Sequence, residues 1–199
     1  TSLGSWALLE ALTQLNTWIQ DDIISDSATM SVNVSARQLT DPGFCDVVAE
    51  ALSRSGLPAH LLWLEVTETM MIENPELARN TLQRIHATGV RIALDDFGTG
   101  FGTLTHINRV PINRLHVDRP FVLDMATNPA HMAIVRAVTQ LSQSIGLDVT
   151  IEGVETTSQL ALLRAMGCDS MQGYLFSRPM EASRVPRFVR RQEHVALSA

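Results

Sequence analysis

One pattern recurs three times along the chain: an amphipathic segment with helical periodicity, then a glycine, then a short apolar run. A glycine suits the left-handed position that follows the last residue of a helix. Alternation of helix and strand at this spacing indicates β-α units and a parallel sheet. The predicted helices are 44–54, 76–88 and 131–145, the glycines are Gly56, Gly89 and Gly146, and the strands that follow are 61–66, 90–94 and 147–151.

An Asx-Pro pair precedes each of these helices: Asp41-Pro42, Asn74-Pro75 and Asn128-Pro129. Asp or Asn as N-cap with proline at the first helical position is a typical helix start. The rest of the chain extends the same scheme, and no linker or low-complexity segment interrupts it. We therefore expect one α/β domain over residues 1–199 with six parallel strands. The remaining predicted helices are 6–19, 158–166 and 181–191, and the remaining strands are 30–34, 115–117 and 171–176.

The composition is that of an ordinary globular protein, with 199 residues, 45% apolar and 18% charged. A net charge of −6, without a basic run that alternates with aromatic residues, argues against a DNA-binding surface. Cys45 and Cys168 form no CxxC pair, which suits a reducing compartment. No apolar run approaches the ~18 residues of a membrane span, and no signal peptide is visible. We expect a cytoplasmic protein that makes no membrane contact through this segment.

Two adjacent carboxylates, Asp95 and Asp96, follow the apolar strand at 90–94 and precede a loop with glycines at 98, 100 and 102. Adjacent residues on a strand point to opposite faces. Both carboxylates serve one site only if the strand ends there and the backbone turns, which glycines permit. Two unpaired carboxylates side by side are costly unless they are solvated, protonated or bound to a cation. A lone Asp pair is more often a solvated strand end, so the other strands decide the question.

Polar groups follow every predicted strand at its carboxyl end. In a parallel α/β barrel the functional residues lie at this end of the strands. The set is rich in oxygen, which suits Mg²⁺, Mn²⁺ or Ca²⁺ rather than structural zinc. One or two hard cations at the mouth of a barrel would suit phosphate-ester hydrolysis. The residues are Asn33, Glu65, Glu68, Asp95, Asp96, His116, Asp118, Glu152, Glu155 and Gln172.

Structural explanations compete with these functional ones. Glu68 and Glu155 suit helix N-termini equally well, because the helix dipole favours a carboxylate there. Asn33 and Gln172, taken singly, are better explained as residues that cap loops. The histidines at 86, 106 and 131 have no partner at metal-ligand spacing, and we expect them at the surface or in packing roles.

Six motifs, in this order, resemble the EAL domain, a family of bacterial cyclic di-GMP phosphodiesterases and their degenerate relatives. The resemblance runs from Trp6 to Pro179. It implies a modified TIM (β/α)8 barrel, here with about six of eight strands because the first two are missing. The motifs are Asn33-Val-Ser-Ala-Arg-Gln-Leu39, Leu64-Glu-Val-Thr-Glu68, Asp95-Asp-Phe-Gly-Thr-Gly100, Val117-Asp-Arg119, Glu152-Gly-Val-Glu-Thr156 and Gln172-Gly-Tyr-Leu-Phe-Ser-Arg-Pro179.

The resemblance also implies a role for each site residue. It implies two Mg²⁺ or Mn²⁺ ions, inhibition by Ca²⁺, and attack of water on one phosphodiester of cyclic di-GMP to give the linear dinucleotide. Asp95 would bridge the ions. Glu152 would bind metal or activate water, and Glu68 would anchor the loop 97–103. The implied sets are Asn33, Glu65, Asp95, Asp96 and Glu152 for metal, Glu152, His116 and Glu68 for catalysis, and Gln172 and Asp118 for substrate.

Three features depart from the family pattern. Glu10-Ala11-Leu12 spells the signature motif but lies on the first predicted helix, whereas the family's signature glutamate lies on an earlier strand that is missing here. His116 stands where the family has a catalytic lysine, and an unperturbed imidazole is mostly neutral at pH 7. Gly102 stands where the loop usually carries a serine.

Three functions remain open. The first is a cyclic di-GMP phosphodiesterase domain of weak or no activity in this form. The second is a degenerate EAL domain that acts as a cyclic di-GMP receptor or a protein-interaction module, and the third is a metal-dependent barrel enzyme of other chemistry. Six strands cannot close an eight-stranded barrel, so strands 30–34 and 171–176 would be open edges. We therefore expect a homodimer or oligomer, in a protein fused to upstream sensory or cyclase domains.

Overall fold

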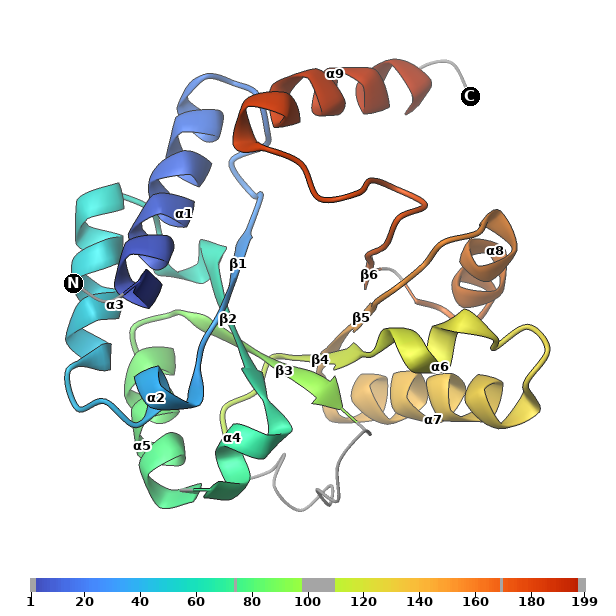
Figure 1. The fold of residues 1–199 in the computed structure, drawn as a ribbon, viewed down its shortest axis with the longest axis horizontal. Helices are drawn as coiled ribbons and strands as arrows, with labels where there is room; N and C mark the ends of the chain where they lie inside the picture. Colours follow the sequence, from blue (N-terminus) through green and yellow to red (C-terminus); the bar gives the residue numbers. More distant parts are fainter. Residues whose placement is uncertain (1–2, 74, 98–109, 169, 197–199) are drawn as a thin grey trace.

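The computed structural model describes residues 3–73, 75–97, 110–168 and 170–196. Its strands form one parallel sheet in the order of the sequence, and this sheet curls into part of a barrel (Figure 1). The expected barrel-type architecture of six parallel strands is thus confirmed. The strands are β1 (Met30–Asn33), β2 (Leu62–Thr67), β3 (Arg91–Phe97), β4 (Arg114–Val117), β5 (Asp148–Ile151) and β6 (Ser170–Met171).

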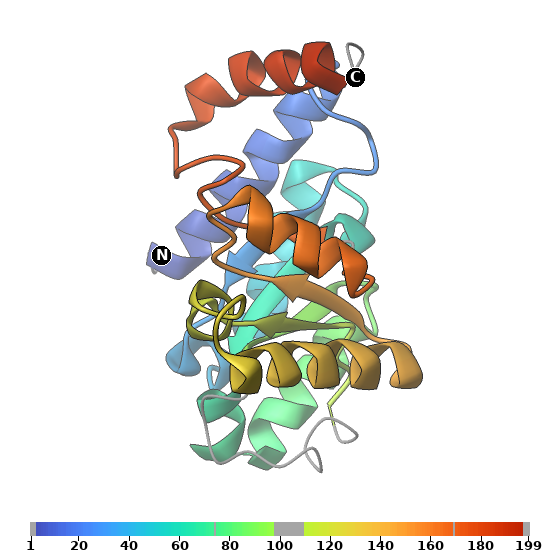
Figure 2. The ribbon, with the colours of Figure 1, turned by 90° about the vertical axis from the view of Figure 1, so that its right-hand side faces the viewer.

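Most helices lie on the outer side of the curled sheet (Figure 1), and α7 packs against β4 and β5 (Figure 2). The α-helices are α1 (Leu3–Gln20), α2 (Ala36–Leu39), α3 (Phe44–Ser55), α4 (Glu68–Glu73), α5 (Pro75–His86), α6 (Arg119–Leu123), α7 (Pro129–Ile145), α8 (Thr157–Ala165) and α9 (Val185–Ala196). Two short 3-10 helices are η1 (Ala59–Leu61) and η3 (Ala182–Arg184).

The alternation of side chains along the strands separates the core from the site. Leu64, Ile92 and Leu115 are fully buried in the core between sheet and helices. Their neighbours Glu65 and His116 point to the opposite face, the concave side of the sheet. Apolar residues therefore hold the helices on the sheet, while the inner face is left for polar chemistry.

The predicted capping of α7 is confirmed, and the predicted capping by Asp41-Pro42 is wrong. The side chain of Asn128 accepts hydrogen bonds from the N–H groups of Ala130 (3.1 Å) and His131 (3.4 Å), and Gly146 ends α7 with φ +74°. The Asp41 carboxylate instead accepts the Gly43 N–H at 2.8 Å, which closes a turn before the helix. Helix α3 still begins at Phe44, the predicted first residue. Asn74 of the second pair lies outside the described residues.

The predicted strand 171–176 is wrong beyond its first residue. β6 ends at Met171, and the backbone then turns, with Phe176 and Ser177 donating N–H bonds to the Gly173 carbonyl at 3.1 and 3.3 Å. The apolar run resembles a strand in sequence, but its glycine allows the chain to pack against the loop that follows β5. Gly173 lies so close to the Val154 backbone that no Cβ would fit.

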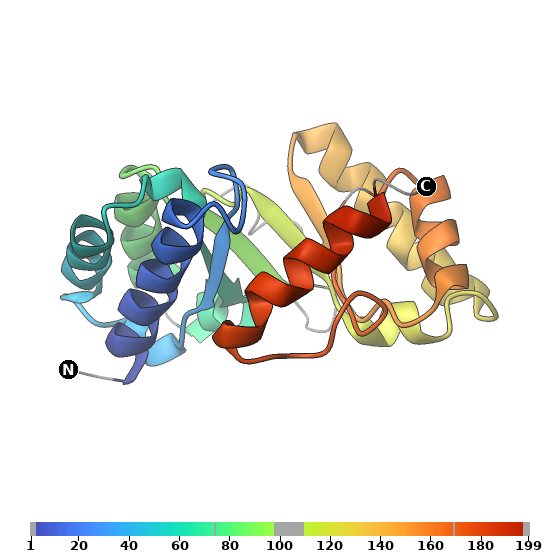
Figure 3. The ribbon, with the colours of Figure 1, turned by 90° about the horizontal axis from the view of Figure 1, so that it is seen from above.

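β1 and β6 are the two edge strands of the described sheet, as the sequence predicted for 30–34 and for the start of 171–176. Helix α9 lies over the open side of the curl, between the regions of α1 and α8 (Figures 1 and 3). Among the described residues, none of the helices is long and apolar enough to cross a bilayer.

Candidate active site

The two adjacent carboxylates lie on an irregular part of β3. The strand runs on to Phe97 rather than ending at residue 94, and its register with β4 shifts between Leu94 and Phe97. Asp96 takes the left-handed φ of +57°, and its N–H donates to Asp95 Oδ1 at 2.9 Å. The predicted strand end is therefore wrong, and an extra residue of the bulge type redirects the two side chains. The glycines at 98, 100 and 102 lie outside the described residues.

Three strand ends bring a carboxylate, an imidazole and a second carboxylate together. One ligand atom each of Asp95, His116 and Glu152 lies within 4.8 Å of the others. His116 Nδ1 is 2.8 Å from Glu152 Oε1 and 3.7 Å from Asp95 Oδ1. The opposite ring nitrogen, Nε2, is 3.9 Å from Glu65 Oε1. The structure thus groups four of the residues singled out in the sequence around one buried imidazole.

Glu65 approaches His116 across the intervening strand β3. Glu65 of β2 is in register with Ala93 of β3, and Ala93 is in register with Arg114 of β4, two residues before His116. The contact between Glu65 and His116 therefore joins residues that lie two strands apart and in neighbouring rows of the sheet.

The acidic neighbours of His116 decide its charge. The imidazole is 2% exposed, and this burial lowers its pKa. Contact with Glu152 and the charges of Glu65 and Asp95 outweigh burial and raise the pKa of His116 above its ordinary value. The 2.8 Å contact with Glu152 is an ion-pair distance without good hydrogen-bond alignment. The cluster therefore favours the cationic form of the imidazole more than water does.

The surroundings of Asp95 disfavour its charged form, and a bound cation would stabilise that form. Burial, joined by the charge of Glu152, raises the pKa of Asp95, although the Asp96 N–H and His116 oppose the rise. A carboxylate whose charged form is disfavoured by burial and by a second carboxylate gains from a bound cation. Oxygen donors of this kind fit hard divalent ions. The residues present therefore fit a divalent metal.

The other predicted metal ligands border this group. Asn33, at the end of the edge strand β1, is in register with Glu65 and is exposed. Asp96 is exposed and lies outside the 4.8 Å group. Both lie at the same end of the sheet as the cluster, and Asp96 is joined to it by its N–H, which donates to Asp95 Oδ1.

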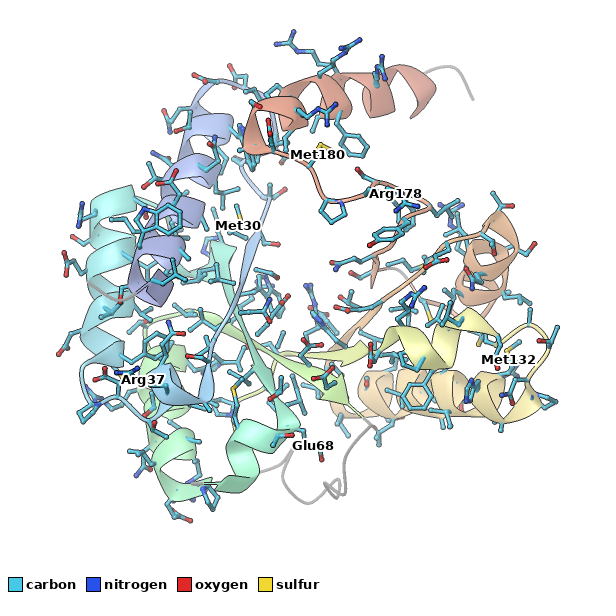
Figure 4. All side chains as sticks on the ribbon, in the orientation of Figure 1. Met30, Arg37, Glu68, Met132, Arg178 and Met180 are labelled. Atoms are coloured by element: carbon cyan, nitrogen blue, oxygen red, sulfur yellow. The ribbon has the colours of Figure 1, made fainter. Side chains whose placement is uncertain are left out.

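A cavity of about 830 Å³ adjoins the cluster. Its wall includes the predicted substrate residues Asp118 and Gln172, together with Glu152. Asp118 is also the N-cap of α6, where it accepts the Arg119 N–H at 2.6 Å. Helix α9 closes one side with Val185 and Phe188. Figure 4 shows the labelled Arg178, another lining residue, on the segment that runs along this hollow.

Glu68 lies apart from the cluster, at the start of α4 (Figure 4). Its side chain is buried, and its Oε2 has no hydrogen-bond partner among the described residues. The loop that it is predicted to anchor, 97–103, falls almost wholly outside the described part of the chain. The anchoring role of Glu68 stays a prediction.

Sequence reasoning missed the ion pair between Arg119 and Glu155. Arg119 donates from Nε and Nη2 to Glu155 Oε1 at 3.1 and 2.9 Å, which joins the loop after β4 to the loop after β5. Gly153 permits the approach, because any Cβ there would overlap the Arg119 side chain. The ion pair ties the loop that carries Glu152 to the first residue of α6. The sequence did contain a signal for this pair. Arg119 directly follows Asp118, and Glu155 lies three residues after Glu152.

This combination defines a barrel-type α/β protein with a carboxylate-rich site at the carboxyl ends of parallel strands. The family model for the EAL domain matches residues 1–179, so the chain belongs to the EAL domain family.

Similar proteins are named for cyclic di-GMP chemistry. The chain is 38% identical over 184 residues to the bifunctional diguanylate cyclase/cyclic di-GMP phosphodiesterase MucR of Pseudomonas aeruginosa, covering 92% of this chain and 26% of that protein. It matches a structure of the PaMucR phosphodiesterase in complex with c-di-GMP with a TM-score of 0.86 and 37% identity, covering 92% of this chain and 73% of that one. The chain spans about a quarter of the length of the curated relatives it matches.

Two other solved structures are similar in fold and sequence. The EAL domain of Mycobacterium smegmatis DcpA matches with a TM-score of 0.89 and 35% identity, covering 95% of this chain and 84% of that one. Klebsiella pneumoniae BlrP1, solved as calcium and as manganese complexes with cyclic di-GMP, matches with a TM-score of 0.80 and 27% identity over 88% of this chain and 44% of that one.

Proposed function

We propose that this chain hydrolyses cyclic di-GMP to the linear dinucleotide with the help of divalent cations. The observation that carries the proposal is the convergence of Asp95, His116 and Glu152 at three neighbouring strand ends. The family supplies the substrate, since MucR is both named for this activity and solved with the nucleotide.

The proposed metal ligands are carboxylates and one amide from four strands. They would hold Mg²⁺ or Mn²⁺, two ions in all, with Ca²⁺ as an inhibitor. When bound, such ions activate water for attack and neutralise charge on the phosphodiester. The calcium and manganese complexes of BlrP1 support divalent ions in this type of domain. The ligands are Asn33, Glu65, Asp95, Asp96 and Glu152.

The proposed catalytic role of the chain itself centres on Glu152. Its carboxylate faces both the cluster and the cavity, so it can accept a proton from an attacking water. His116 Nδ1, 2.8 Å from Glu152 Oε1, helps to hold that carboxylate in place. Arg119, through Glu155, limits the movement of the loop that carries Glu152.

The cavity beside Glu152 is the proposed nucleotide site. At about 830 Å³ it is in the size range of small-molecule sites, and apolar and polar residues both line it. Gln172 and Asp118 provide polar groups that can fix the orientation of a nucleotide. Glu68, in this proposal, holds the loop that begins at residue 97.

A second candidate is a receptor that binds cyclic di-GMP without hydrolysing it. The observation that favours it is His116, which replaces the family's lysine and takes up contacts with three carboxylates. In either case we propose that residues 1–199 act as a single EAL domain in the bacterial cytoplasm. We also propose a homodimer or oligomer, because β1 and β6 are edges of the described sheet.

Chromatography of reaction mixtures distinguishes the two candidates. Cyclic di-GMP is incubated with the protein and Mn²⁺, Mg²⁺ or Ca²⁺, with a Glu152→Gln variant as control. Linear dinucleotide formed with Mn²⁺ or Mg²⁺, and lost in the variant, supports the phosphodiesterase. Saturable nucleotide binding by calorimetry without product under any ion supports the receptor. Neither binding nor turnover contradicts both.

A further inference from the structure

A tryptophan and an arginine lie stacked on the inner face of the sheet, one layer below the carboxylate cluster. Trp63 and Arg114 precede Glu65 and His116 by two residues, so they face the same side of β2 and β4. Arg114 Cζ is 3.8 Å from the centroid of the Trp63 ring, a close cation–π contact. Trp63 is fully buried, and neither its Nε1 nor Arg114 Nε has a hydrogen-bond partner among the described residues.

The neighbouring strand holds the other side of the guanidinium. Arg114 is in register with Asp148 of β5, and Arg114 Nη2 is 3.6 Å from Asp148 Oδ2. The Arg114 side chain is 19% exposed and that of Asp148 is 58% exposed. Water therefore screens the carboxylate more than the guanidinium, so Asp148 neutralises the charge of the more buried Arg114 only in part.

This charge lies within electrostatic reach of the site. Burial lowers the pKa of Arg114, while Asp148 and, more weakly, Glu65 raise it. Arginine stays charged despite such shifts, because its ordinary pKa lies far above neutral pH. The sequence contains no lysine, and Arg114 supplies a permanent cation two residues before the titratable imidazole of His116.

We propose that Arg114 is a positioning residue that balances the negative charge of the metal site. Arg114 is held by Trp63 and Asp148 in the same register row as Glu65, with Ala93 between them. Its cation offsets part of the charge of the carboxylates and lowers their affinity for divalent ions. It thereby stabilises the cluster when no metal is bound. The inference rests on the proposed metal site, and it does not depend on which reaction that site performs.

Calorimetric titration of Mn²⁺, without nucleotide, tests the sign of this effect. Arg114→Gln is expected to bind Mn²⁺ about tenfold more tightly than the parent, because it removes a like charge from a partly buried site. Arg114→Lys keeps the charge and is expected to stay within about twofold of the parent. Arg91→Gln is the matched control. Arg91 also faces the Trp63 ring, at 5.2 Å, but it is exposed, so its loss should leave the dissociation constant unchanged.

A purely structural role gives the opposite result. If Arg114 only supported the fold, both Arg114 variants would bind Mn²⁺ more weakly, and that outcome overturns the proposal, as does unchanged affinity in Arg114→Gln. Thermal unfolding provides a second readout, since tighter binding by Arg114→Gln requires a larger rise in Tm on addition of Mn²⁺.

Asp148→Asn covers the case in which Arg114→Gln fails to fold. Removing the Asp148 charge leaves Arg114 less neutralised, so Mn²⁺ affinity should fall, and unchanged or increased affinity overturns the proposal. A parent protein that binds no Mn²⁺ overturns the proposal together with the metal site. If the Mn²⁺ affinities of the variants change in the expected directions but the parent does not turn over the nucleotide, only the proposed reaction is overturned.

Discussion

His116 Nδ1 and Glu152 Oε1 lie 2.8 Å apart, although the two residues come from different strands and different motifs. The contact places His116 directly on the carboxylate proposed to accept a proton. The charge of His116 is therefore coupled to the state of the carboxylates. Metal bound to those carboxylates would offset the negative charge that raises the pKa of the imidazole.

His116→Lys is expected to raise turnover of cyclic di-GMP. A lysine keeps its positive charge when cations neutralise Glu65, Asp95 and Glu152, whereas the imidazole loses the charges that raise its pKa. The gain should be of the order of 10²-fold in kcat, the effect typical of one electrostatic group. Steady-state kinetics with Mn²⁺ measure it, and His116→Gln should show no gain. An unchanged kcat in a His116→Lys protein that still binds Mn²⁺ would refute this role.

The metal-free protein should lose stability as the pH rises above about 6.5, the ordinary pKa of histidine. The pKa of His116 is raised in the folded state, so its contribution to stability is complete below the unfolded pKa of about 6.5. That contribution is lost as the pH rises through the folded-state pKa. Urea unfolding in EDTA measures the effect. In His116→Gln this part of the pH dependence should vanish, and an identical pH profile in both proteins would show that the cluster does not stabilise the imidazolium.

Gly173→Ala should destabilise the protein by about 1–3 kcal/mol, the usual cost of overpacking. A Cβ at this position would overlap the carbonyl and amide atoms of Val154, which are rigid backbone. Gly146→Ala is the control, because a Cβ there meets no atom within 4 Å and carries only the cost of a left-handed φ. Chemical denaturation compares the two. Equal losses of unfolding free energy would show that the contact between residues 173 and 154 is not tight in solution.

The open sheet edges predict self-association. Light scattering on the 199-residue chain should give a mass above that of the 21.9 kDa monomer. Hydrogen exchange should be slow at the outer amides of β1 or β6, because a neighbouring chain covers an edge that would otherwise be solvated. A stable monomer with fast exchange at both edges would show that the uncovered edge strands do not require a neighbouring chain.

The regular parts of this fold could be predicted because local signals set them. Asn128 and Gly146 mark the two ends of α7 by capping chemistry that needs no distant partner. Buried strands such as β2 show as apolar runs. The failures came where a distant contact decides the local structure. Residues 171–176 look like a strand, yet the packing of Gly173 on Val154 turns the chain after Met171.

The site was predictable as a list of residues and not as a geometry. Strand ends and family motifs identified Asp95, His116 and Glu152. That His116 would lie among three carboxylates depends on the register of β2, β3 and β4. The stack of Arg114 on Trp63 depends on the same register. Neither register nor the bulge at Asp96 leaves a local mark in the sequence, so these relationships required the structure.

The central claim is that the strand-end carboxylates form a divalent metal site, and titration calorimetry with Mn²⁺ tests it most directly. The parent protein is compared with Asp95→Asn and with Asp26→Asn, which changes an exposed carboxylate in the turn before β1. Mn²⁺ should bind saturably to the parent and to Asp26→Asn. Its affinity for Asp95→Asn should be at least tenfold weaker, about the effect of removing one nearby charge. Equal Mn²⁺ binding by Asp95→Asn and the parent would contradict the central claim.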